Sequence, residues 1–399
     1  MTTLNDSPSR TRRILCFIVF ALAYAAPNYA QYQFSPLGTQ IIETYGLSGV
    51  QFNSIFTAPM LPAVFLSLIS GLLVDRCGYK PVLGVSILLT ALGAVTRVFA
   101  NGYGLMYVAM IFLGFSAAFI SANASKVLSV FFKPEKISVI MGLVLTITTT
   151  GMVLSMATTT SLGIRRAFIL AAVLAVAVFV LWIALMPRVK PRKEDGVSES
   201  VSLGKAFLAV VKNRHVWVAA GVIFFLNGAM TGMSANIPTA LKTVRGFTDG
   251  AADIAGAVLM VGNLLGSLLT PTISLKTGKF RLVLILCGLV SLLGCTFSWR
   301  LPGIWLYVGL ILTGYTFGSG MAQLLSVAIR LPGVGPAFAG TAGGLIATLD
   351  LLGGVVLPTY VASPIAGSNL TVFFLILGLL GIPWMLGVYL LPRALDEKG

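Results

Sequence analysis

Charged side chains are scarce in this sequence, and their scarcity excludes a water-soluble globular fold. Asp, Glu, Lys and Arg make up only 10% of the 399 residues, whereas about 25% is usual in soluble domains. Hydrophobic residues account for 57%. They fall in long blocks, many of them about 20 residues, the length that crosses a hydrocarbon layer of ~30 Å. We therefore expect an all-α polytopic membrane protein.

Residues typical of metal sites and catalysis are also rare. The chain has one histidine, His215, and four cysteines that form no CxxC pair, which argues against a Cys/His metal site. We expect no cofactor. The sequence has no GxxxxGK[ST] phosphate loop, so an ATP-driven pump is excluded. With one histidine, it also lacks the clustered polar groups that a membrane enzyme needs, and we expect no enzymatic activity.

The net charge of +15 fits a membrane surface better than a nucleic acid. Lys and Arg concentrate in residues 1–13, 75–80, 187–214, 276–281 and 392–399. The opposite side of the membrane would hold only Arg97, Arg165, Arg166, Lys242, Arg245 and Arg300. By the positive-inside rule, this bias places both termini on the cytoplasmic side of the cytoplasmic membrane. The cations would then contact anionic lipid, and no nucleic acid partner is expected.

Twelve apolar segments predict twelve transmembrane helices. They are residues 14–36, 51–74, 81–100, 104–131, 136–160, 165–186, 216–241, 251–275, 281–299, 303–329, 336–362 and 369–391. The polar segment 187–214 separates two sets of six and predicts a cytoplasmic linker with a short surface helix at 202–212. The domain organisation is therefore a tail at 1–13, a six-helix half at 14–186, the linker, a second half at 215–391 and a tail at 392–399.

The two halves resemble each other when one is shifted by 200 residues. Three features coincide in this register: Tyr45–Ser48 with Arg245–Thr248, Arg76–Gly78 with Lys276–Gly278, and Gly114 with Gly314. Six helices per copy, with both termini on one side, make this a parallel repeat, an arrangement common in transporters.

The gap after the second segment carries a recognisable motif, Gly71-Leu-Leu-Val-Asp75-Arg76-Cys-Gly78-Tyr-Lys80. It resembles the loop signature of the major facilitator superfamily, G-x-x-x-D-[RK]-x-G-x-[RK]. The resemblance covers essentially the whole chain and implies two pseudo-symmetric six-helix halves that rock about a central site. It also implies a gating role for the motif residues Gly71, Asp75, Arg76, Gly78 and Lys80.

Each motif residue type has a physical role in such a gate. Gly71 would allow close helix approach and Gly78 a tight turn. Asp75 is implied to pair across the gap between the halves and hold the outward-open state, with Arg76 and Lys80 supplying cations. The second copy departs from the pattern, because Leu275 replaces the acid. An ordinary charged turn is the alternative.

Ionisable residues inside membrane segments are costly and usually functional. Asp350 lies midway along 336–362, and Lys126 lies in the cytoplasmic half of 104–131. A carboxyl group in this setting can carry a proton, so Asp350 is the candidate for proton coupling. Lys126 is the candidate for recruiting an anion. The alternatives are a structural hydrogen bond for Asp350 and a side chain that reaches the interface for Lys126.

Amide and aromatic side chains on cavity-lining segments complete the predicted substrate site. They are Tyr24, Asn28, Gln31, Tyr32, Asn227, Asn236, Tyr315 and Gln323. Residues 24, 28, 31 and 32 share one helical face. Each could instead form a hydrogen bond between helices.

Together these features predict a monomeric secondary active transporter, a symporter or antiporter, with a small-molecule substrate. Lys126 favours an organic anion or similar metabolite, and Asp350 favours coupling to protons. The alternative is a proton-coupled multidrug or toxic-compound exporter. Exporters of this family tend to carry a proline in a glycine motif, G-x(8)-G-P-x-x-G, and residues 142–151 contain none. That absence favours the metabolite transporter.

Overall fold

The computed structural model describes residues 10–132, 134–188 and 210–396, which are almost entirely helical. Eleven helices in this part of the chain are long and apolar enough to cross a membrane. One of them, α8 (Pro134–Leu185), has 52 residues and is interrupted at Gly163, where φ is 71°. A straight helix of that length would measure about 78 Å, far more than one ~30 Å layer. Helix α8 therefore holds two spans, and the predicted twelve-helix, two-half layout is confirmed.

The chain forms two compact units, which are described separately. One comprises the described residues of Met1–Phe34 and Ala58–Lys193, and the other those of Ser35–Thr57 and Glu194–Gly399. The division falls inside the second span, between α3 (Gly49–Thr57) and the 3-10 turn η1 (Ala58–Met60). Pro59 in this turn cannot donate a backbone hydrogen bond, which accounts for the local break in the helix.

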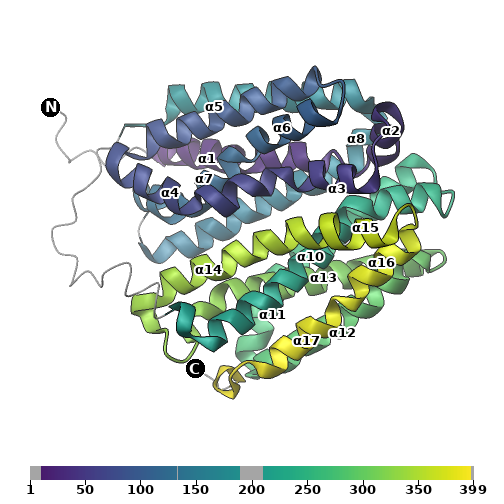
Figure 1. Cartoon of the computed structure of the whole chain (residues 1–399). Helices are drawn as coiled ribbons and strands as arrows, with labels where there is room; N and C mark the ends of the chain where they lie inside the picture. The colour runs from purple at the N-terminus through teal and green to yellow at the C-terminus, as the bar shows by residue number, and fades with distance from the viewer. Residues whose placement is uncertain (1–9, 133, 189–209, 397–399) are drawn as a thin grey trace. The chain divides into compact units, whose positions relative to one another are not determined.

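The first unit is a bundle of packed helices (Figure 1). Helix α1 packs on α8 and α7, α5 packs on α8 and α6, and α4 packs on α7. Trp182, Phe20 and Leu83 are fully buried in its core. Besides α8, its helices are α1 (Arg10–Tyr32), α4 (Leu61–Cys77), α5 (Tyr79–Val98), α6 (Tyr103–Leu113) and α7 (Phe115–Ser129).

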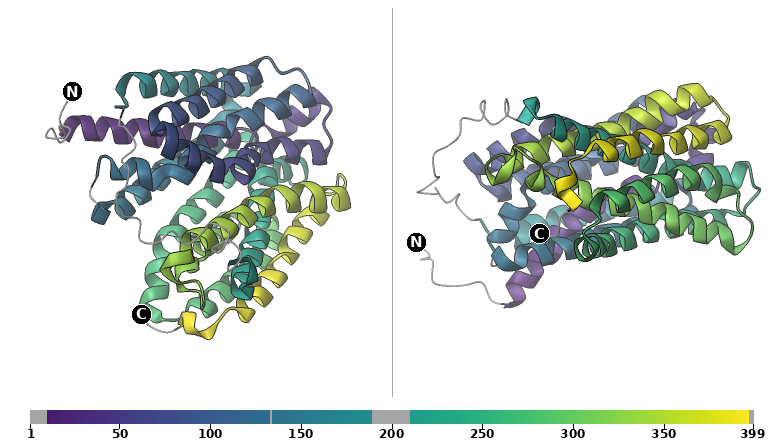
Figure 2. Two further views of the ribbon diagram at one scale, coloured as in Figure 1. Left: turned by 60° about the vertical axis from the view of Figure 1, so that its left-hand side comes forward. Right: turned by 90° about the horizontal axis from the view of Figure 1, so that it is seen from below.

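The second unit contains the C-terminal helices together with α2 and α3. Helix α11 packs on α13, α10 on α14, and α12 on α13 and α17 (Figures 1 and 2). A π-helical turn, η4 (Leu357–Ala362), continues α14. The other helices are α2 (Gly38–Tyr45), α10 (Arg214–Thr243), α11 (Asp249–Thr277), α12 (Phe280–Phe297), α13 (Ile304–Ser326), α14 (Gly335–Val356), α15 (Ser363–Ala366), α16 (Leu370–Leu379) and α17 (Gly381–Leu390).

The 200-residue register recurs in three dimensions. Gly46 and Gly246 both adopt positive φ, at 60° and 66°, a conformation that favours glycine. A Cβ added to Gly114 would lie 1.9 Å from the Pro59 carbonyl oxygen, and one added to Gly314 would lie 2.0 Å from the Leu259 carbonyl oxygen. Both partners in the second contact are 200 residues beyond those in the first. The two copies therefore use the same backbone contact to bring equivalent helices together.

Two expected helices, 14–36 and 202–212, correspond only in part to the described helices. The first helix ends at Tyr32 rather than residue 36, and a short helix, α2, follows in the predicted gap. Most of the surface helix expected at 202–212 lies outside the described residues, although 210–212 are helical.

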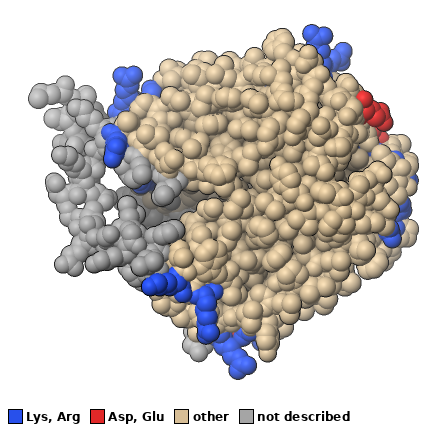
Figure 3. Space-filling model, viewed as in Figure 1, with Lys and Arg blue, Asp and Glu red and all other residues tan. Residues whose placement is uncertain are grey.

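Figure 3 shows one face of the molecule, on which charged side chains lie at the edges and the surface between them is uncharged. Such a surface suits contact with lipid.

Candidate transport and gating residues

Asp350 and Asn227, predicted separately from two segments, lie together in the second unit. Asn227 Nδ2 donates to the Asp350 carbonyl oxygen at 2.8 Å, and Thr231 Oγ1 donates to Asn227 Oδ1 at 3.2 Å. Asp350 is 5% exposed, and its Oδ1 has no hydrogen-bond partner among the described residues. An unpaired buried oxygen is costly, so the carboxyl group is open to a proton, a water or a substrate donor.

Glycines bring the two helices of this cluster close enough for those bonds. A Cβ at Gly353 of α14 would lie 2.0 Å from the Phe224 carbonyl oxygen of α10. A Cβ at Gly228 would lie 2.4 Å from the Leu357 side chain. Small residues at such contacts allow the backbones to approach closely. Because Gly228 and Gly353 carry no side chains at this contact, Asp350 can lie beside α10.

A second polar cluster joins α11 and α13 and contains the predicted Tyr315 and Gln323. Thr270 Oγ1 donates to the Tyr315 hydroxyl at 2.7 Å and lies 2.5 Å from Ser319 Oγ. Gln323 Nε2 donates to the Ser319 carbonyl at 3.3 Å. Gln323 is 3% exposed, and its Oε1 has no partner among the described residues. This oxygen could accept a hydrogen bond from a bound solute.

Asn236, also predicted to bind substrate, is engaged in helix packing. Its Nδ2 donates to Asn53 Oδ1 at 2.9 Å and to the Gly232 carbonyl at 3.0 Å. Asn53 Nδ2 in turn donates to Ser363 Oγ at 3.0 Å. Since an amide nitrogen has two N–H groups, both Asn236 donors are used. Asn236 therefore ties α3 to α10 here.

A buried ion pair lies in the second unit, and it was not predicted from the sequence. Lys242 Nζ lies 3.0 Å from Asp253 Oδ1 and 3.1 Å from Asp249 Oδ1, and it donates to the Pro36 carbonyl at 2.7 Å. The Lys242 and Asp253 side chains are 7% and 2% exposed, whereas Asp249 is 59% exposed. Lys242 was expected in an outer loop. Its acid partners, 7 and 11 residues away, were a sequence signal that could have been used.

The candidates on α1 belong to the first unit. Asn28 Nδ2 donates to the Tyr24 carbonyl at 2.8 Å, a bond within one helix. Tyr24 and Asn28 are half-buried, and Gln31 and Tyr32 are buried. The four positions share the predicted helical face of α1.

Arg97, which was expected near the outer end of the predicted helix 81–100, lies inside the helix bundle. It is fully buried, with Nη1 donating to the Ala30 carbonyl at 2.6 Å and Nη2 to Gln33 Oε1 at 2.7 Å. Its guanidinium also lies 4.1 Å from the centre of the Phe168 ring. These contacts stabilise the cation inside the bundle, although its Nε has no hydrogen-bond partner among the described residues. Arg97 therefore joins α5 to α1 and α8.

The remaining candidates lie at the ends of α4, α5 and α7. Lys126 is exposed in the last turn of α7. Gly78 forms the turn between α4 and α5 with φ 82°, and the exposed Arg76 precedes it. Asp75 lies in α4, and its side chain is outside what the structure describes. No described atom lies within 4 Å of a Cβ at Gly71, and the close helix approach expected there stays a prediction.

Comparison with known proteins relates this arrangement to transporters. The Major Facilitator Superfamily model matches residues 14–358. An uncharacterized protein of Archaeoglobus fulgidus is 27% identical over 191 residues, 47% of this chain and 84% of that protein.

Two solved structures have a similar fold. A bacterial homolog of the human lysosomal transporter Spinster, inward-facing and unoccupied, has a TM-score of 0.74 at 13% identity and covers 98% of this chain and 97% of its own. The nucleoside transporter NupG has a TM-score of 0.74 at 14% identity, with 95% and 98% covered. At these identities the likeness shows the fold alone.

Proposed function

The chain belongs to the Major Facilitator Superfamily, and we propose that it is a proton-coupled secondary transporter of a small organic anion or similar metabolite. Membership makes it a multi-pass membrane transporter and not an enzyme. The proposal adds the solute class, the coupling ion and alternating access by rocking of two halves. We also propose that the protein is a monomer of the cytoplasmic membrane with both termini in the cytoplasm.

The observation that carries the proposal is the environment of Asp350. Its Oδ1 is buried without a partner among the described residues, and the neighbouring Asn227 amide donates to the Asp350 backbone carbonyl. An ionised carboxylate in this position would leave Oδ1 without a compensating donor, and burial of such a charge is expensive. The group can hold a proton in one state of the transport cycle and release it when water or a solute donor reaches Oδ1.

Substitution of Asp350 tests proton coupling. In liposomes, Asp350→Asn should abolish uptake driven by a pH gradient and leave counterflow of labelled solute, since asparagine keeps the shape but cannot release a proton. Asp249→Asn serves as the control, because this acid of the same unit is 59% exposed. Uptake by Asp350→Asn that still responds to the pH gradient would refute the role of Asp350.

Lys126 supports the anion class, because it is an exposed cation in the last turn of a helix that belongs to the predicted cavity lining. A thermal-shift screen with carboxylates, sugar phosphates and nucleosides would identify a solute, since a ligand that binds the folded state raises the apparent stability. Lys126→Ala should lose the shift and Lys126→Arg should retain part of it. Equal shifts in all three proteins would exclude anion recruitment by Lys126. A shift with cationic dyes instead would favour the exporter.

The gating proposal rests on the motif residues. Asp75 and Arg76 lie in the last turn of α4, Gly78 forms the turn between the helices and Lys80 lies in the first turn of α5. All four match the residue types of the family signature. If Asp75 stabilises the outward-open state, Asp75→Ala should reduce the labelling, by a membrane-impermeant reagent, of single cysteines introduced on the outward side of the predicted cavity. Unchanged labelling would count against the gate.

A further inference from the structure

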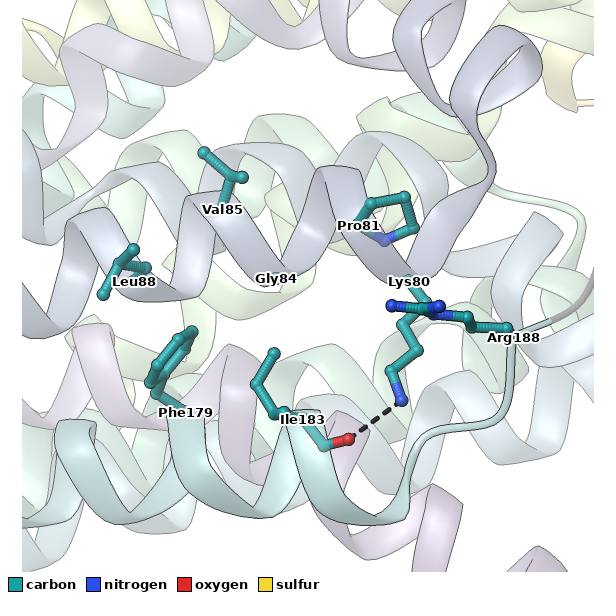
Figure 4. Close-up of a pocket in the computed structure, with 8 residues that line it drawn as sticks. All are labelled: Lys80, Pro81, Gly84, Val85, Leu88, Phe179, Ile183 and Arg188. Carbon is teal, nitrogen blue, oxygen red and sulfur yellow. Dashed lines mark hydrogen bonds between the residues drawn. The ribbon is translucent and has the colours of Figure 1, made fainter.

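A groove between α5 and the second span of α8 has a cationic end and apolar walls. It has a volume of about 280 Å³ and is lined by Lys80, Gly84, Val85, Phe179, Ile183 and Arg188, among others. Figure 4 shows the two basic side chains together at one end and the apolar side chains extending away from them. None of the lining residues is Asp or Glu. The positive charge is therefore not neutralised by an acid of the groove.

Hydrogen bonds fix the two chain segments that carry these cations. Lys80 Nζ donates to the Ile183 carbonyl at 2.9 Å, which uses one of its three N–H groups. Trp182 Nε1 donates to the Lys80 carbonyl at 3.1 Å, and the Tyr79 hydroxyl donates to the Pro187 carbonyl at 2.7 Å. The ammonium group is thus held at the groove, and Arg188 follows directly after the segment that Tyr79 anchors.

The apolar part of the groove extends along both helices. A second hollow of about 360 Å³, lined by Val95, Ala172, Val173, Val176 and Ala177, lies between the same two helices. From residue 80 to residue 95, α5 rises about 22 Å, more than the ~15 Å of half a hydrocarbon layer. Val85 and Val173 are 57% and 58% exposed. An acyl chain can therefore pack against these walls across one leaflet.

We propose that this groove binds an anionic phospholipid, with its phosphate between Lys80 and Arg188 and an acyl chain along α5 and α8. Basic pockets between membrane helices are suited to anionic head groups. A zwitterionic lipid adds an ammonium group that both cations would repel. A soluble anion would leave the apolar walls without a partner. The site is separate from the Asp350 cluster, which belongs to the other unit.

Lipid titration of the full-length protein in detergent tests the proposal. Dioleoylphosphatidylglycerol and dioleoylphosphatidylcholine carry identical acyl chains, and native mass spectrometry would count the bound lipids. The tightest binding should favour phosphatidylglycerol. Arg188→Gln should weaken it about fivefold, the worth of one cation at a membrane surface, and Lys80→Gln/Arg188→Gln should weaken it further. Lys279→Gln, an exposed cation of the other unit, should change nothing.

A second variant separates the lipid from other occupants. Val85→Trp should fill the groove and weaken phosphatidylglycerol binding while both cations remain; Val85 is exposed, so the fold should tolerate it. Equal binding of both lipids, or full affinity in Arg188→Gln, would overturn the proposal. So would glycerol 3-phosphate binding as tightly as the lipid, which would indicate a simple anion site. A dimer that Val85→Trp dissociates would identify a second copy as the occupant.

Discussion

Replacement of Gly114 or Gly314 by alanine tests the repeated backbone contact directly. The added Cβ would lie 1.9 Å from the Pro59 oxygen or 2.0 Å from the Leu259 oxygen, whereas ordinary contacts begin near 3.4 Å. The obstructing atoms belong to backbone, so no side chain can rotate away. Each helix pair must separate by about 1.5 Å, and overpacking of this kind costs about 1–3 kcal/mol.

Gly142 of α8 provides the matched control. Nothing in the described structure lies within 4 Å of a Cβ at this position, and alanine is the better helix former by about 1 kcal/mol. Gly142→Ala should therefore be neutral or stabilising, whereas Gly114→Ala and Gly314→Ala should be destabilising. The separation of roughly 2–3 kcal/mol corresponds to about 5–10 °C for a unit of this size.

The assay is the apparent unfolding midpoint of detergent-purified protein, followed by tryptophan fluorescence. Similar decreases for Gly114→Ala and Gly314→Ala are expected, because the two contacts are equivalent by the 200-residue shift. If Gly114→Ala melted together with Gly142→Ala, the helices would not be in backbone contact. A decrease in only one of the pair would refute the equivalence of the two copies.

Two further predictions concern buried cations. Lys242→Met should lower the free energy of unfolding by about 3–5 kcal/mol because it removes the cation that pairs with the buried Asp253 carboxylate. Asp249→Asn should cost less than about 1 kcal/mol. Chemical denaturation would measure both, and a small effect of Lys242→Met would mean that the pair is not buried. Arg97→Lys should cost about 2 kcal/mol, since one ammonium cannot reproduce two charged hydrogen bonds and the ring contact. Arg165 is exposed, so Arg165→Lys serves as the control and should change the free energy of unfolding by no more than about 0.5 kcal/mol. Equal stability of Arg97→Lys and Arg165→Lys would show that the buried contacts of Arg97 do not stabilise the fold.

The membrane spans could be predicted because the length of an apolar block depends on the bilayer rather than on tertiary detail. Helix α2 could not, because its eight residues are too few to cross a membrane and follow a break in the first span. The turn at Gly78 was predictable, since the motif places a glycine where φ is positive. The close approach expected at Gly71 stays a prediction, because a glycine in a sequence does not reveal which neighbouring helix faces it.

Side-chain partners were harder to predict than helices because they depend on the register between helices. Arg97 lies near a helix end, where a charged residue usually reaches solvent, and its acceptors are 67 and 64 residues away in the sequence. Asp350 was identified because a mid-helix acid is conspicuous by itself. The position of Asn227 beside Asp350 depends on the close contacts at Gly228 and Gly353, and only the structure shows these contacts.

The two copies of the repeat share the glycines at 46/246, 78/278 and 114/314 but do not share four charged residues of their helices. In the 200-residue register, Asp350 corresponds to Thr150, Lys126 to Ser326, Arg97 to Phe297 and Lys242 to Ile42. Because the helix approach at Gly114 recurs at Gly314 without these charges, the fold of a copy does not require them. Arg97 and Lys242 tie neighbouring segments of their own units together by donating to backbone carbonyls, and Lys242 also pairs with Asp253. Asp350 is a mid-helix acid whose Oδ1 has no partner among the described residues, and the proposed proton-carrying role therefore rests on this residue.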